Sequence, residues 1–137
     1  MRWAGARSYG LNMAIQSKRR FVAIIDDDDA IRIALRDLME ESGFEAFACA
    51  SAEEFLESGN KADTACLVTD IRMPGISGLE LQSRLNADHQ RIPIVFLTAH
   101  GDEDIRLQAM RAGAVEFMTK PFDDEVLLGC VRAALSK

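Results

Sequence analysis

Asp70 stands where an apolar run ends. The run Cys66–Thr69 is typical of a buried strand, and Pro74-Gly75 stops that strand from continuing. A carboxylate at the carboxyl end of a strand in an open α/β sheet lies where such sheets usually bind ligands. Taken alone, this acid is better explained as a strand-ending residue that caps a turn. The chemistry depends on what other residues end neighbouring strands.

Four further residues of the right chemical types follow apolar runs in the same way. Asp26 and Asp27 follow Phe21–Ile25, Thr98 ends the run 92–98, and Lys120 follows the run 114–119. Carboxylates brought close together repel each other, and a hard divalent cation relieves that repulsion. Magnesium suits a site with few carboxylate oxygens, because it keeps several waters. The quartet 26–29 lacks the glycine and the distal glutamate of an EF-hand loop.

A carboxylate of this kind can attack phosphorus and form an aspartyl phosphate. The oxygens of the transferred phosphoryl group then need cations and hydrogen-bond donors. Magnesium supplies one positive partner, the Lys120 ammonium supplies a second, and the Thr98 hydroxyl offers a hydrogen bond. Each of these residues has an ordinary structural explanation by itself, but their shared place at strand ends favours phosphoryl chemistry.

The surrounding pattern alternates short apolar runs with amphipathic helices. The predicted strands are 21–25, 44–49, 65–70, 92–98 and 114–119. Helices are expected from about Ile31 to Gly43, from a capping box at 51–54, from Leu79 to Ala87, over 102–112 and over 123–135. Five such units predict an α/β fold, a doubly wound five-stranded parallel sheet of (βα)5 type. The common strand order 2-1-3-4-5 brings the first and third strands together at the switch point.

Length and charge divide the chain into two parts. The 137 residues suffice for one domain, and the net charge is −6. Residues 1–20 contain five cations and no acid, so residues 21–137 carry −11. We expect residues 1–20 to form a basic, disordered extension and residues 21–137 to form the domain. The acidic body argues against direct binding of nucleic acid, and no apolar run is long enough to span a bilayer.

Residues 21–137 resemble the receiver domain of two-component response regulators, which has a CheY-like fold. Four ordered pieces carry the resemblance: Ile25–Asp28, Thr69–Pro74, Phe96–Ala99 and Lys120–Phe122. The amino-acid sequences of Thr98–Asp102 and Ala112–Phe117 are most similar to those of the FixJ-like branch of this family.

The resemblance implies that Asp70 is the phosphoacceptor and that Asp26 and Asp27 bind magnesium, or manganese in its place. Arg72 would give the metal its backbone carbonyl, while Thr98 and Lys120 would hold the phosphoryl group. The only reactions implied are magnesium-dependent self-phosphorylation and autodephosphorylation, and not the turnover of an enzyme.

The resemblance also implies a switch. Phosphorylation would draw Thr98 toward the new charge and turn Phe117 inward, which would remodel the face made by helix 102–112, strand 114–119 and helix 123–135. The peptide before Pro121 would be cis. Arg72 and His100 occupy the positions that tune the lifetime of the phosphate in the family.

Three rival interpretations remain open. A phosphatase of the haloacid dehalogenase type also forms an aspartyl phosphate, but it needs a second acid two residues later, where this chain has Arg72. A flavodoxin-like carrier needs a phosphate-binding loop after the first strand, where this chain has four aspartates. A protein-interaction module with the same fold would not depend on phosphorylation.

The expected partners follow from the receiver interpretation. They are a sensor histidine kinase or a phosphotransfer protein, and a second copy of the chain through the switch face. The odd number of cysteines in apolar surroundings, Cys49, Cys66 and Cys130, favours a reducing, cytoplasmic location. No output domain is seen, so we expect either a stand-alone receiver or a receiver from a longer protein.

Overall fold

The structure, a computed structural model, describes residues 20–99 and 101–136. These residues form a five-stranded parallel sheet in the order β2-β1-β3-β4-β5. The predicted fold and strand order are confirmed. The strands are β1 Phe21–Ile25, β2 Ala46–Cys49, β3 Thr64–Thr69, β4 Ile94–Thr98 and β5 Glu116–Thr119.

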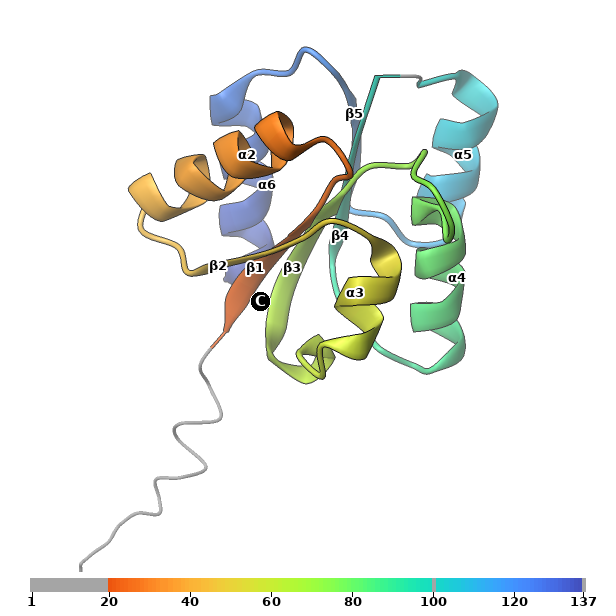
Figure 1. Cartoon of the computed structure of the whole chain (residues 1–137). Helices are drawn as coiled ribbons and strands as arrows, with labels where there is room; N and C mark the ends of the chain where they lie inside the picture. Colours follow the sequence, from red (N-terminus) through yellow and green to blue (C-terminus); the bar gives the residue numbers. More distant parts are fainter. Residues whose placement is uncertain (1–19, 100, 137) are drawn as a thin grey trace, which may run out of the picture.

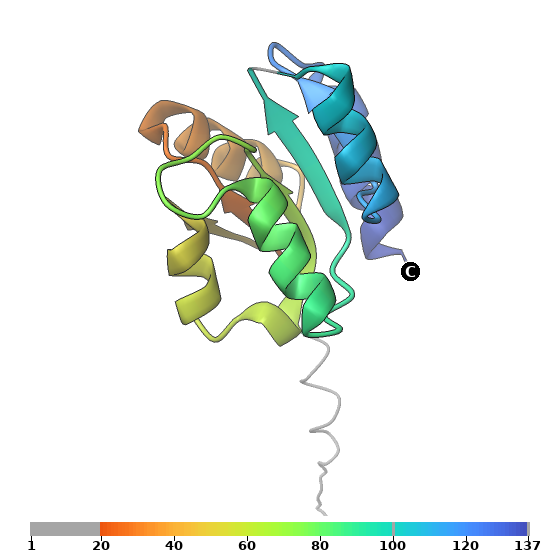
Figure 2. The ribbon, with the colours of Figure 1, turned by 90° about the vertical axis from the view of Figure 1, so that its right-hand side faces the viewer.

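Helices connect successive strands and cover both faces of the sheet (Figures 1 and 2). They are α2 Asp29–Glu41, α3 Ala52–Glu57, α4 Gly78–Ala87, α5 Glu103–Arg111 and α6 Asp124–Leu135, with a short 3-10 turn at Lys61–Asp63. Helices α2 and α6 lie on one face, and α3, α4 and α5 lie on the other. None of the helices in the described residues is long and apolar enough to cross a membrane.

Alternation along the strands divides the core between the two faces. In β1, Ala23 and Ile25 pack with Phe55 of α3 and Leu81 of α4, whereas Val22 and Ile24 face α2 and α6. Strand β3 is buried along its whole length, as expected for the centre of a sheet covered on both faces. The strands appear in the sequence as continuous apolar runs because helices bury their side chains on both faces of the sheet.

Three strands are shorter than predicted, and each has a local reason. β2 begins at Ala46 because the Phe44 amide donates to the Met39 carbonyl and still belongs to the end of α2. β4 begins at Ile94, after Pro93, which has no N–H for a ladder and instead accepts a hydrogen bond from Leu67. β5 begins at Glu116 because the Ala114 amide donates to the Ala109 carbonyl and still belongs to the end of α5.

Side-chain caps start the helices at the carboxyl edge of the sheet. Asp28 accepts hydrogen bonds from the amides of Ala30 and Ile31 at the start of α2. Ser51 and Glu54 form a variant of the predicted capping box: Ser51 Oγ accepts from Glu54 N, but Glu54 Oε1 accepts from the amide of Ala50, one residue before the cap. These caps fix where each loop ends and therefore where the residues at the edge lie.

Candidate functional site

Asp26, Asp27 and Asp70 come together because β1 and β3 are neighbours. Ile25 pairs with Thr69 in the parallel register, so the residues that follow each strand leave the sheet side by side. The Asp70 amide donates to the Ile25 carbonyl at 3.1 Å, and the Asp26 amide donates to the Cys49 carbonyl at 3.3 Å. Backbone hydrogen bonds thus continue the sheet as far as the two acids.

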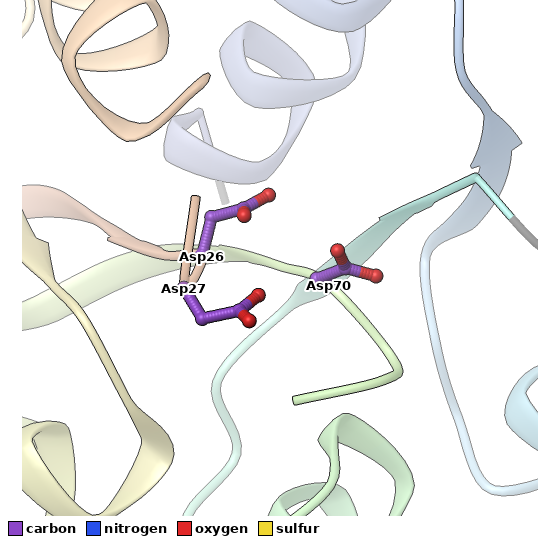
Figure 3. Close-up of side chains that lie close together, drawn as sticks. All are labelled: Asp26, Asp27 and Asp70. Carbon is purple, nitrogen blue, oxygen red and sulfur yellow. The ribbon is translucent and has the colours of Figure 1, made fainter. Parts of the chain in front are cut away.

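The three carboxylates form one cluster. One oxygen of each lies within 4.8 Å of the others, and Figure 3 shows the side chains close together at the ends of the two strands. Asp26 is 2% exposed, Asp70 is half-buried and Asp27 is exposed. The cluster therefore opens to solvent on the side of Asp27.

Lys120 supplies a cation to this cluster. Its Nζ lies 2.9 Å from Asp26 Oδ2 and 3.1 Å from Asp70 Oδ2. Burial by itself would lower the pKa of Lys120, but the hydrogen bonds to Asp26 and Asp70 and their negative charges outweigh burial and raise it. The backbone holds this lysine in place as well, because its amide donates to the Thr98 carbonyl at 2.8 Å.

The residues present fit a magnesium ion. Three carboxylates that face one another carry more negative charge than the single ammonium balances, and hard carboxylate oxygens are the ligands that magnesium prefers. Asp26, Asp27 and Asp70 are able to hold such an ion, and the Arg72 carbonyl lies two residues after Asp70. Manganese accepts the same oxygen ligands.

Several residues that support the acids do not stand out in the sequence. The Arg32 guanidinium donates to the Asp26 carbonyl at 2.8 Å and pairs with Asp29. Asp26 Oδ1 accepts from the Asp28 amide at 2.9 Å, and Asp70 Oδ1 accepts from the Ile71 amide at 2.6 Å. The signal for Arg32 was its place in the first turns of the helix that follows the acidic quartet.

Gly78, at the start of α4, is a second residue of this kind. A Cβ built there would lie 2.3 Å from the Asp70 carbonyl oxygen and 3.1 Å from Ile71 Cα. The Gly78 amide also donates to the Ile71 carbonyl at 2.8 Å. Only a glycine allows α4 to begin this close to the backbone of Asp70.

The residues predicted to form the switch lie on β4 and β5. Thr98 is fully buried at the end of β4. Phe117 is 9% exposed and packs against Phe96, with 6.3 Å between the ring centroids. A Cβ added at Gly101 would lie 2.4 Å from Thr119 Cγ2 and 3.0 Å from Phe117 Cε1, so the loop after β4 lies directly on β5.

Three further residues were predicted to belong to the site: Pro121, His100 and Arg72. The peptide bond between Lys120 and Pro121 is cis. His100 lies outside the described residues, and the Arg72 side chain is exposed.

Fold and site together define a doubly wound α/β domain with an acidic ligand site at its topological switch point. The family model of the response regulator receiver domain matches residues 22–132. The chain therefore belongs to the response regulator receiver domain family.

Curated relatives indicate the branch of that family. The chain is 47% identical over 116 residues to the transcriptional regulatory protein FixJ of Azorhizobium caulinodans, covering 85% of this chain and 55% of that protein. It is 44% identical over 114 residues to the response regulator protein TodT of Pseudomonas putida, covering 83% of this chain and 50% of the relative. The chain spans about half the length of these two relatives.

Solved structures agree with this assignment. The crystal structure of FixJ-N has a TM-score of 0.77 and 37% identity, covering 85% of this chain and 94% of that one. The response regulator StyR has a TM-score of 0.80 and 44% identity, covering 86% of this chain and 60% of that one. The predicted resemblance to FixJ-like receivers is confirmed.

Proposed function

We propose that this domain accepts a phosphoryl group on Asp70 from a sensor histidine kinase or a phosphotransfer protein, in the cytoplasm. The observation that carries the proposal is the cluster of Asp26, Asp27 and Asp70 with Lys120 Nζ 3.1 Å from Asp70 Oδ2. In a family of signalling domains, an accepting carboxylate surrounded by metal ligands and one ammonium is the arrangement that phosphoryl transfer requires.

In the transfer step, a carboxylate oxygen of Asp70 forms a bond to phosphorus while the bond from phosphorus to the donor's imidazole nitrogen breaks. The imidazole leaves with the electron pair of that bond. Magnesium held by Asp26, Asp27, Asp70 and the Arg72 carbonyl would supply positive charge to the phosphoryl oxygens. Hydrolysis of the aspartyl phosphate would then return Asp70 to its free form.

Lys120 and Thr98 would hold the transferred group. The Lys120 ammonium already contacts Asp70 Oδ2, so a short movement would pair it with a phosphoryl oxygen. The Thr98 hydroxyl belongs to the last residue of β4, beside the strand that Asp70 follows. Its hydrogen bond to the phosphoryl group would draw the end of β4 toward the site.

That movement would carry the signal. Phe117 packs in the space beside the loop that follows Thr98, so a displacement of Thr98 would change the packing of the Phe117 ring. The face formed by α5, β5 and α6 would then present a different surface to a partner or to a second copy of the chain. The acidic body of the chain does not favour direct contact with nucleic acid.

Arg72 and His100 would set how long the phosphate lasts, by shielding it or by positioning water. The Arg72→Ala, His100→Ala double variant should change the rate at which phosphate is lost after the phosphoryl donor is removed. A decay rate equal to that of the wild type would remove this role from both residues.

Intact mass spectrometry after incubation with acetyl phosphate and magnesium tests the proposal. We expect the mass of one phosphoryl group on the wild type, its absence in Asp70→Asn and its absence when a chelator is present. Asp37→Asn, which changes an exposed acid on α2, is the matched control and should be modified like the wild type.

Two results would contradict the proposal. An adduct that persists in Asp70→Asn would assign the chemistry to another residue. A wild type that neither gains mass nor binds beryllofluoride would instead favour a protein-interaction module that acts without phosphorylation.

A further inference from the structure

Glu53 of α3 contacts the loop that leads from Asp70 to α4. Its Oε2 accepts a hydrogen bond from the Ile76 amide at 3.1 Å, across 23 residues of sequence. A Cβ added at Gly75 would lie 2.2 Å from the same oxygen, so the carboxylate rests directly on the backbone of Gly75. Gly75 has φ +79°, a conformation that strongly favours glycine.

The contact lies in the middle of a loop whose beginning and end are already fixed. At its beginning the Asp70 amide bonds to β1, and at its end the Gly78 amide donates to the Ile71 carbonyl. Between these points, Arg72, Pro74 and Gly75 are exposed. The hydrogen bond from Ile76 to Glu53 therefore ties an exposed segment to a separate helix.

We propose that Glu53 is a positioning residue for the metal site, and this inference rests on the proposed function. Arg72, whose carbonyl is the proposed fourth protein ligand, lies between the fixed beginning of the loop and the contact with Glu53. By holding the backbone at Gly75 and Ile76, Glu53 limits the positions that the Arg72 carbonyl adopts relative to Asp70. Its contribution to magnesium binding is made through the loop, without contact with the ion.

The two carboxylate oxygens of Glu53 differ in their hydrogen bonding: Oε2 accepts from the Ile76 amide, and Oε1 does not share that bond. Oε1 is buried and has no hydrogen-bond partner among the described residues. An unpaired buried acceptor destabilises the folded protein, so burying Oε1 against the loop lowers the free energy of unfolding. The useful interaction is the hydrogen bond that Oε2 accepts, and a neutral amide in place of the carboxylate retains that bond.

Three substitutions of Glu53 separate the hydrogen bond from the charge. Glu53→Gln keeps the length and an acceptor oxygen but removes the charge. Glu53→Asp keeps the charge but is one methylene shorter and does not reach the Ile76 amide. Glu53→Ala removes both. Glu54→Gln is the matched control, because Glu54 follows in the same helix and its carboxylate bonds to the Ala50 amide instead of the loop.

The measurement is the Kd for magnesium by titration calorimetry on the whole chain, with circular dichroism to verify folding. Supporting residues around metal ligands typically change metal affinity about tenfold or more, so we expect Glu53→Ala and Glu53→Asp to raise the Kd about tenfold. Glu53→Gln and Glu54→Gln should stay within about a factor of two of the wild type.

Two results would overturn the inference while leaving the proposed function intact. One is a wild-type Kd in Glu53→Ala or, if that variant fails to fold, in Glu53→Asp. The other is weak binding in Glu53→Gln with normal binding in Glu53→Asp, which would make the charge responsible. A wild type that does not bind magnesium would overturn the proposed function itself, and the inference with it.

Discussion

Two regions of the molecule, named here the acidic end and the aromatic end, are held by different forces. The acidic end, Asp26, Asp27 and Asp70 with Lys120, is held by ion pairs and by backbone hydrogen bonds of defined geometry. The aromatic end, Phe96, Phe117, Gly101 and Thr119, is held by close apolar packing.

This difference matches what each end must do. Charged groups need a fixed geometry and respond to any cation that enters, because Coulomb interactions are strong in a partly buried site. Apolar contacts have no direction and no net charge, so a ring can repack when a neighbouring strand end moves. The acidic end can therefore hold charged groups in a fixed geometry through ion pairs, while the aromatic end can repack because it is held by apolar contacts.

The largest expected effect is at the aromatic end. Phe117→Ala removes a nearly buried ring and should lower the free energy of unfolding by about 4 kcal/mol. Because the ring carries no charge, magnesium should stabilise this variant by the same amount as the wild type, as measured by urea unfolding with and without magnesium. If magnesium raised the free energy of unfolding of Phe117→Ala by a different amount than that of the wild type, the two ends would not be held independently.

A slightly smaller effect is expected from the cation of the acidic end. Lys120→Met leaves the carboxylates of Asp26 and Asp70 without their ammonium partner and should cost about 3 kcal/mol of stability. Magnesium should restore more stability to this variant than it adds to the wild type, because more uncompensated negative charge remains. Equal increments in the two proteins would contradict this account of the site.

Asp27→Ala tests the metal itself. With magnesium at ten times its Kd, the wild type should gain about 1.4 kcal/mol of stability, and the variant should lose most of that gain. Thermal unfolding with and without magnesium measures both values. Asp28→Ala would not serve as the control because it also removes the helix cap, so we choose the exposed Asp37→Ala.

At neutral pH the smallest effect is that of the buried thiols, whose ionisation changes stability only at alkaline pH. Burial raises the pKa of Cys66 from 9.0 to about 12, and burial with the charge of Glu54 does the same for Cys49. Their contribution to stability is complete below pH 9 and is lost as the pH rises toward 12, because the unfolded chain ionises first. Unfolding midpoints should fall less steeply above pH 9 in Cys66→Ala, and an unchanged slope would refute this assignment.

The sequence was sufficient for the fold because its apolar runs are separated by clear breaks. The acids of 26–27 and Asp70 each end such a run, and in a parallel sheet the carboxyl ends of all strands share one edge. The identity and order of the strands are therefore enough to predict that Asp26, Asp27, Asp70, Thr98 and Lys120 share one edge. The strand limits were less accurate, because Phe44 and Pro93 are apolar but take part in other contacts.

The tertiary structure decided how these residues meet. The structure shows the Lys120 ammonium on Asp26 and Asp70, a pair of contacts that the strand pattern did not indicate, and its contact with a phosphoryl group stays a prediction. The sequence pattern also did not predict three other contacts: Arg32 with Asp26, Gly78 with Asp70, and Glu53 with Ile76. A strand-ending acid leaves a local pattern of hydrophobicity, whereas the partner of a side chain depends on distances between segments that only the folded chain brings together.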